Sequence, residues 1–161
     1  MKLYHGSDVI VNHPQIRKPN RTLDYGSGFY TTTSFDQAEK WVRRKLGENI
    51  PVGYVCVYDI DEQELADLDV LRFDSPDERW LDFVMANRTN KDFTHSHDIV
   101  YGPVANDRVY AAFGLYESGV FNKQELIREL RAYKLVDQML FHSEKALEKL
   151  IFVESIKITQ Q

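Results

Sequence analysis

Apolar and polar residues alternate along several short segments of the chain, which is the period of a half-buried β-strand. Residues 52–60, VGYVCVYDI, are rich in valine and tyrosine, and residues 29–33, FYTTT, are aromatic or β-branched throughout. From this pattern we predict strands at residues 1–4, 29–33, 52–60, 98–104, 136–142 and 152–158. The first strand is expected to end where the loop-forming sequence His5-Gly6-Ser7 begins.

Other segments place apolar residues three to four positions apart, as the buried face of a helix requires. Three of them begin with a capping pair, in which a serine or asparagine precedes a glutamine or glutamate by three positions. These pairs are Ser34 with Gln37, Ser75 with Glu78, and Asn122 with Glu125. We therefore predict helices between residues 34 and 47, from 75 to about 87, at 107–116, from 122 to about 133, and at 143–150.

Strands and helices follow one another in irregular order, which predicts an α+β fold with a mixed or mainly antiparallel sheet. No internal repeat, linker or change of composition divides the chain, so residues 1–161 are expected to form a single domain. The sequence Gly26-Ser27-Gly28 leads into a strand and lacks a third glycine, which excludes a Rossmann dinucleotide motif.

Composition supports one packed domain, because 43% of the 161 residues are apolar and 12% are aromatic. The single cysteine, Cys56, excludes an intramolecular disulfide and a cysteine-rich zinc site. Polar residues interrupt the apolar start of the chain, and no run approaches the roughly 18 apolar residues of a membrane span. We therefore expect a cytoplasmic protein with no membrane association.

The net charge of −5 is unevenly distributed, because residues 1–50 carry +3 and the remaining residues carry −8. Ten acidic residues and only two arginines lie at 59–82, which makes this acidic segment a candidate docking surface for a basic partner. An acidic chain is a poor nonspecific binder of nucleic acid. Arg43, Arg44 and Lys45 can nevertheless form a local track for phosphates.

The histidines other than His5 show no motif for a metal site or a hydrolase. His95 and His97 flank a serine in a polar stretch, which favours a solvated loop over a metal site. No HExxH or GxSxG sequence occurs, so a zinc protease or a serine hydrolase of that type is not expected. We expect no bound metal.

Two motifs in the first fifty residues change the interpretation when they are taken together. Residues 3–7 read LYHGS, and residues 24–41 read DYGSGFYTTTSFDQAEKW. This pair resembles the front half of the ADP-ribosyltransferase fold of the diphtheria-toxin and poly(ADP-ribose) polymerase class, in which HG[ST] ends one strand and G-x-G-[IF]-Y opens the next. Trp41 lies eleven residues after Tyr30, where the polymerases carry a second ring that sandwiches nicotinamide.

The resemblance extends over nearly the whole chain, to a bacterial family of small ADP-ribosyltransferase-like proteins of the toxin–antitoxin and phage-defence type. Its further supporting sequences are DIVYGPVANDRVY at residues 98–110 and DQMLFHSEKALEKLIF at residues 137–152. The resemblance implies two small, mainly antiparallel sheets with flanking helices and a cleft between them. It also makes an antitoxin or another regulatory protein a candidate partner.

NAD is the co-substrate that the resemblance implies. In the family pattern His5 bonds a hydroxyl of the adenine-side ribose, the backbone of Gly6 receives the nicotinamide carboxamide, and Tyr30 stacks on the cationic ring. The catalytic residues carried over are His5, Tyr30 and Gln138. The NAD-binding residues carried over are His5, Gly6, Ser7, Arg21, Gly28, Phe29, Tyr30 and Trp41.

One position departs from the family pattern. Gln138 stands where the family usually has a glutamate that holds the nicotinamide ribose, and an amide can bond the ribose but cannot take up a proton. Either the acceptor needs little activation or another carboxylate serves, with Asp107, Asp98 and Asp137 as the candidates. Asp137 is the least favoured, because adjacent strand residues point to opposite faces of a sheet.

The expected function is transfer of ADP-ribose from NAD to a macromolecular acceptor, either protein or nucleic acid, with release of nicotinamide. Hydrolysis of NAD, with water as the acceptor, is the alternative within enzyme chemistry. A non-catalytic module that binds NAD or a partner is the alternative outside it, because Gln138 replaces the glutamate. Arg17, Lys18 and Arg21 lie between the two N-terminal motifs and are candidates for holding the pyrophosphate.

Overall fold

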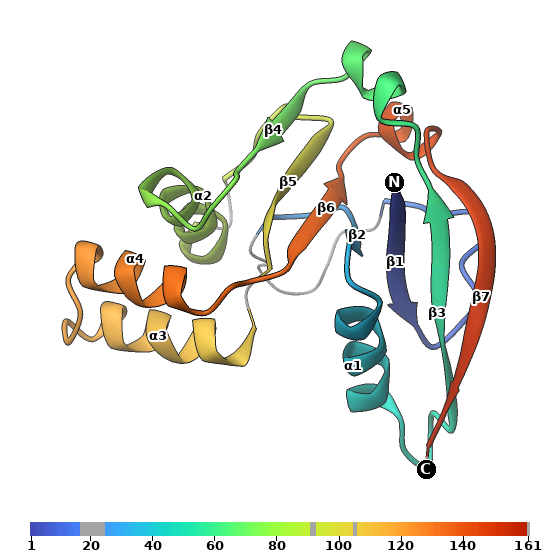
Figure 1. Cartoon of the computed structure of the whole chain (residues 1–161), viewed down its shortest axis with the longest axis horizontal. Coiled ribbons are helices and arrows are strands. Elements are labelled where there is room, and N and C mark those ends of the chain that lie inside the picture. The colour runs from blue at the N-terminus through green and yellow to red at the C-terminus, as the bar shows by residue number, and fades with distance from the viewer. Residues whose placement is uncertain (17–24, 91–92, 105, 161) are drawn as a thin grey trace.

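The computed structural model of the chain describes residues 1–16, 25–90, 93–104 and 106–160, and strands and helices alternate irregularly along them (Figure 1). The strands are β1 (Lys2–Ser7), β2 (Phe29–Thr32), β3 (Val52–Asp59), β4 (Val70–Arg72), β5 (Ile99–Pro103), β6 (Asp137–Phe141) and β7 (Ile151–Thr159). The helices are α1 (Phe35–Lys45), α2 (Glu78–Thr89), α3 (Asp107–Glu117), α4 (Lys123–Ala132), α5 (Glu144–Leu147) and the 3₁₀-helix η1 (Glu62–Asp67). The predicted α+β fold class is confirmed.

The strands form one seven-stranded sheet in the order β4-β5-β6-β2-β1-β3-β7. Strands β4 and β5 run parallel, and the other neighbouring pairs are antiparallel. The expectation of two separate sheets is corrected, because the pairing of β2 with both β1 and β6 joins the two halves. The joint is narrow, because β1 and β2 are in register at one residue pair, with Tyr4 opposite Thr32.

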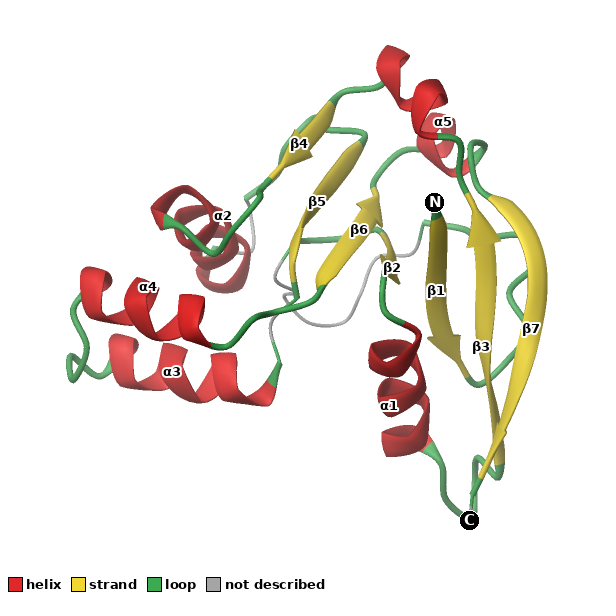
Figure 2. Ribbon diagram, viewed as in Figure 1, coloured by secondary structure: helices red, strands yellow, loops and turns green. Residues whose placement is uncertain are grey.

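The two halves of the sheet are inclined to each other and share one core. Figure 2 shows β4, β5 and β6 at an angle to β1, β3 and β7. One core cluster takes buried residues from both halves: Leu3, Cys56 and Tyr58 from β1 and β3, and Ile99, Met139 and Phe141 from β5 and β6. Burying one such large apolar side chain contributes roughly 1.5 to 3 kcal/mol, so this core holds the halves together.

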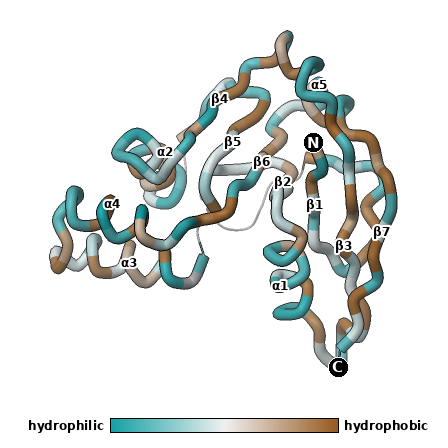
Figure 3. The backbone as a smooth tube through the Cα atoms, viewed as in Figure 1, coloured by the Kyte–Doolittle hydropathy of each residue, from teal (hydrophilic) through white to brown (hydrophobic). Residues whose placement is uncertain are grey.

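The face of the sheet opposite this shared core is covered by two separate groups of helices. Helix α1 packs on β1 and β3, where its buried Ala38 and Val42 meet Val55. Helices α2, α3 and α4 cover the half that contains β5 and β6, around Trp80 and Phe113. In Figure 3, α1 and α4 carry teal, hydrophilic stretches beside apolar ones, as helices with one buried face do.

The first strand is longer than the sequence predicts. His5, Gly6 and Ser7 belong to β1 instead of a loop, because each pairs with a residue of β3. Pairing with a long neighbouring strand outweighs the weak strand preference of glycine and serine. Two elements within the acidic segment, η1 and β4, are not predicted at all.

Side-chain caps fix the starts of the helices. The Ser34 hydroxyl accepts a bond from the Gln37 N–H, and Asn122 with Glu125 forms a reciprocal capping box, as predicted. Helix α2 differs, because its N-cap is Asp77 and not Ser75. Among the described residues, no helix is both long enough and apolar enough to span a membrane.

Candidate functional site

His5 lies at the narrow joint of the sheet, between β1 and β2. Its Nδ1 is 2.6 Å from the carbonyl oxygen of Tyr30. A carbonyl oxygen only accepts hydrogen bonds, so Nδ1 carries the proton and Nε2 offers a lone pair. Burial lowers the pKa of His5, although the bond to Tyr30 acts in the opposite direction. His5 is therefore a neutral imidazole whose Nε2 can accept a bond from a ligand hydroxyl.

Gly6 lies directly beneath α1, and this packing accounts for its lack of a side chain. A Cβ on Gly6 would lie 2.8 Å from the Ala38 carbonyl oxygen, 2.9 Å from Val42 Cγ2 and 3.1 Å from Trp41 Cε3. The structure thus brings Trp41 next to Gly6. The Trp41 side chain is 43% exposed, and Lys45 Nζ lies 5.4 Å from the centre of its ring. The ring is available for stacking at the surface.

Tyr30 lies on the same face of the sheet as Gly6, because Thr32 is opposite Tyr4 and side chains two residues apart share a face. Its hydroxyl donates to the Gly26 carbonyl oxygen at 2.7 Å and accepts from the Tyr25 N–H at 3.3 Å. Gly26 has a φ of +83°, a conformation that favours glycine. The half-buried ring of Tyr30 is therefore held both by its strand and by the preceding turn.

Phe29 and Ser7 form part of the scaffold around His5. Phe29 is 5% exposed, and its ring centre lies 4.3 Å from that of His5 and 5.8 Å from that of Tyr58. Ser7 is buried at the end of β1, where its hydroxyl accepts from the Val9 N–H at 3.2 Å. These contacts account for both side chains without a ligand.

Gly28 permits the turn before β2 to approach the end of β6. A Cβ on Gly28 would lie 2.8 Å from the Phe141 carbonyl oxygen and 3.0 Å from His142 Nδ1. A side chain here would push the start of β2 away from β6. The basic residues expected to hold the pyrophosphate, Arg17, Lys18 and Arg21, lie outside the described residues.

Gln138 lies in β6 and is paired with Thr32 of β2. It therefore shares the sheet face of Tyr30 and Gly6. The side chain is 7% exposed, and its Nε2 donates to the Pro103 carbonyl oxygen at 3.4 Å. The register brings Gln138 to the face of Tyr30, while its amide bonds the end of β5.

Asp137 does not share the face of Gln138. Its Oδ2 accepts from the Tyr101 hydroxyl at 2.9 Å on the opposite side of the sheet, as strand alternation predicts. Burial, followed by this bond, raises the pKa of Tyr101 to about 12. Asp107 is the first residue of α3, and its side chain lies outside the described part of the structure.

Three histidines that the sequence does not connect lie together at the other end of β6. We call His95, His97 and His142 the histidine cluster. The ring centre of His95 lies 4.4 Å from that of His142 and 5.3 Å from that of His97. His95 and His97 lie in a loop, as predicted, but His95 is half-buried in it, and burial lowers its pKa. No group of three or more His, Cys, Asp or Glu among the described residues could hold a metal ion.

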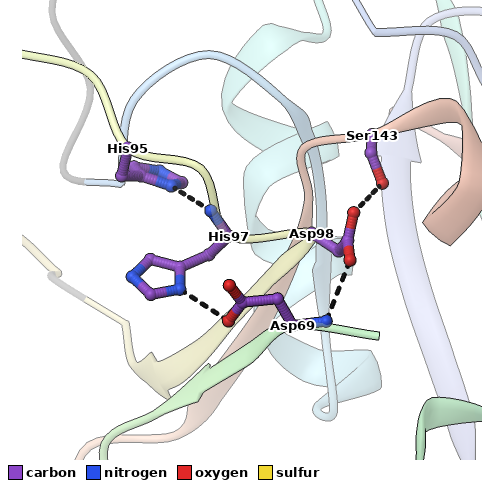
Figure 4. Close-up of polar contacts among 5 residues, drawn as sticks. All are labelled: Asp69, His95, His97, Asp98 and Ser143. Atoms are coloured by element: carbon purple, nitrogen blue, oxygen red, sulfur yellow. Dashed lines mark hydrogen bonds and ion pairs between the residues drawn. The ribbon is translucent and has the colours of Figure 1, made fainter. Parts of the chain in front are cut away.

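Asp98 joins the elements that lie beside the histidine cluster (Figure 4). It accepts from the Asp69 N–H at 2.9 Å and from the Ser143 hydroxyl at 2.7 Å. Both bonds lower the pKa of Asp98, and the bond from Asp69 has the larger effect. Because both bonds join the starts of β4, β5 and α5, the contacts of Asp98 indicate a structural role.

Much of the acidic segment 59–82 is paired within the chain. Lys123 Nζ lies 3.2 Å from a Glu78 oxygen and 2.8 Å from an Asp82 oxygen. Further pairs join Asp59 to Lys2 and Asp67 to Lys149. These partners partly neutralise the segment and weaken it as a docking surface for a basic protein.

The fold and the site define an α+β protein whose single mixed sheet is joined beside His5 and whose two N-terminal motifs meet at this joint, with His5 and Phe29 on one face and Gly6 and Tyr30 on the other. The chain belongs to the family described as "Protein of unknown function (DUF3990)", whose model matches residues 1–152. This match spans every site residue named above. No curated protein matches the chain.

Proposed function

We propose that the protein is an NAD-dependent ADP-ribosyltransferase that transfers ADP-ribose to a macromolecular acceptor and releases nicotinamide. The observation that carries the proposal is the meeting of the two N-terminal motifs. His5 bonds the backbone of Tyr30 at 2.6 Å, and Trp41 lies 3.1 Å from the position of a Cβ on Gly6. The neutral ring of His5, the fixed ring of Tyr30 and the exposed ring of Trp41 thus lie around one strand joint. The ADP-ribosyltransferase class that the sequence resembles uses such groups in its NAD site.

In the proposed reaction, the bond between C1′ of the nicotinamide ribose and the ring nitrogen breaks, and its electron pair leaves with nicotinamide. A nucleophile of the acceptor attacks C1′ and loses its proton. His5 would hold a ribose hydroxyl through Nε2, while Tyr30 and Trp41 would flank the cationic ring. Cation–π attraction of this kind is worth on the order of 1 to 2 kcal/mol in a desolvated site.

The contacts of Gln138 favour a second candidate function. Its amide is buried and bonded to Pro103, and it lacks the negative charge that would stabilise an oxocarbenium-like transition state. A non-catalytic module that binds NAD or a partner needs no such charge. Glutamate at this position would restore the charge, which makes Gln138→Glu the informative substitution.

Incubation of the purified protein with adenine-labelled NAD and a bacterial lysate separates the candidates. A transferase incorporates label into protein or nucleic acid and releases nicotinamide, whereas a hydrolase yields free ADP-ribose. A binding module gives neither product but shows calorimetric heat with NAD. The absence of heat and of a thermal shift at millimolar NAD would overturn the proposal.

A matched pair of variants ties the result to the site. His5→Ala removes the proposed ribose contact, and His13→Ala removes an exposed histidine. We expect the first variant to bind NAD about ten- to a hundredfold more weakly, as the loss of a buried hydrogen bond costs about 1 to 3 kcal/mol. The second variant is expected to behave as the unmodified protein.

A further inference from the structure

The turn at residues 25–28 has a side-chain partner for each of three consecutive backbone positions. The Tyr30 hydroxyl donates to the Gly26 carbonyl oxygen at 2.7 Å. The Nδ1 of His142 lies 2.7 Å from the Ser27 carbonyl oxygen, and His95 bonds the backbone of Tyr25. The turn is thus held by Tyr30 and by two members of the histidine cluster.

These bonds fix the tautomers of both rings. The Ser27 carbonyl only accepts, so His142 carries its proton on Nδ1. His95 accepts from the His97 N–H at Nδ1, at 3.3 Å, so its own proton lies on Nε2. Among the described residues, the Nε2 of His142 is buried without a hydrogen-bond partner. A second proton on that nitrogen would therefore be costly, and His142 favours the neutral ring.

The rings are themselves anchored to regular structure, as Figure 4 shows for His95 and His97. His97 Nδ1 lies 2.8 Å from Asp69 Oδ1, and the Asp69 N–H donates to Asp98. Asp98 also binds the hydroxyl of Ser143, which caps α5. Asp69, Asp98 and Ser143 thus tie the starts of β4, β5 and α5 together beside the histidine cluster.

We propose that His142 and His95 are positioning residues that hold the turn at residues 25–28 and, through it, the ring of Tyr30. The inference rests on the proposed function, in which Tyr30 stacks on nicotinamide. Each ring bonds the backbone of the turn, and the turn in turn bonds the Tyr30 hydroxyl, so they act through this tyrosine. Gly28 allows the arrangement, because a Cβ there would lie 3.0 Å from His142 Nδ1.

Two substitutions of His142 separate its hydrogen bond from its bulk. The side-chain amide of His142→Asn can place an N–H where Nδ1 lies, whereas His142→Phe keeps a ring and removes the donor. His97→Ala is the matched control, because the His97 side chain bonds Asp69 and not the turn. Amide hydrogen exchange at residues 26–30 is the first measurement, with α4 as the internal reference for global stability.

We expect His142→Phe to raise exchange at residues 26–30 about five- to tenfold, the effect of losing one hydrogen bond, with α4 unchanged. His142→Asn should restore protection to within about twofold, and His97→Ala should leave it unchanged. NAD affinity should fall for the phenylalanine variant by a similar factor and recover in the asparagine variant. When Tyr30→Phe is already present, the further loss caused by His142→Phe should be smaller.

Unchanged exchange in His142→Phe, or equal loss in both His142 variants, would overturn the inference. Should the phenylalanine variant unfold, the imidazole ¹⁵N spectrum of the unmodified protein at neutral pH decides the matter. Protonation of His142 at Nδ1 supports the inference, and protonation at Nε2 overturns it. Neither measurement requires NAD, so a protein that binds no NAD would refute the proposed function while the exchange data still judge the turn.

Discussion

Replacing Gly6 with alanine tests whether helix packing or a ligand requires glycine at this position. The new Cβ would lie 2.8 Å from the Ala38 carbonyl oxygen and 2.9 Å from Val42 Cγ2. The carbonyl belongs to the backbone of α1 and cannot rotate away, so the helix must move off β1. Overpacking of this kind costs about 1 to 3 kcal/mol, and we expect Gly6→Ala to lower the free energy of unfolding by that amount.

Urea unfolding followed by circular dichroism measures this loss, and Gly114→Ala provides the matched control. Gly114 lies inside α3, and a Cβ there would meet nothing within 4 Å. Alanine at that position should raise stability by about 0.5 to 1 kcal/mol, because glycine is a poor helix former. If Gly6→Ala is as stable as the unmodified protein but no longer binds NAD, the packing explanation is refuted and the glycine serves the ligand.

Other predictions follow from the same contacts. Burial lowers the pKa of His142 to about 4, so the unfolded chain takes up a proton first as the pH falls. The contribution of the neutral His142 ring to the free energy of unfolding is complete above about pH 6.5 and falls by at most about 3 kcal/mol toward pH 4. This pH dependence should be absent in His142→Asn, which unfolding measured at several pH values would show. Tyr30→Ala should reduce NAD turnover more than Tyr30→Phe, since stacking needs the ring, and full activity of the alanine variant would contradict the role of Tyr30. Gln138→Glu should keep or raise NAD hydrolysis in a nicotinamide-release assay, and loss equal to that of Gln138→Ala would mean that the amide itself is required. Expression should arrest bacterial growth unless a regulatory partner is present, and arrest that persists with His5→Ala would point to a burden unrelated to NAD.

Local signals were sufficient to predict most of the regular elements. The capping residues Ser34 and Asn122 mark the starts of α1 and α4, and the alternation at residues 52–60 marks β3. These signals act within a few residues, so they can be recognised from the sequence alone. The sequence also offers Ser75 as a cap for α2, and because serine and aspartate are both good caps, the choice of Asp77 is not evident from the chain alone.

The pairing of strands that are distant in the chain was harder to predict from the sequence. His5 and Gly6 read as a loop because their strand character comes from β3, whose register places them opposite Cys56 and Val55. The union of the halves into one sheet depends on β2, a strand of four residues that pairs on both sides. The structural need for glycine at Gly6 comes from α1, about thirty residues away in the chain, and no local pattern contains it.

The histidine cluster shows what additional knowledge would have been enough. Strands β5 and β6 are antiparallel, with Ile99 opposite Phe141, so the residues just before Ile99 and just after Phe141 must lie side by side. That single register brings His97 and Asp98 beside His142. The sequence predicts the strands but not their pairing. Without the pairing, His95 and His142 are unrelated polar residues in separate loops. Once the pairing is known, the Y-G-S-G turn before β2 meets both rings, because β2 lies on the other side of β6.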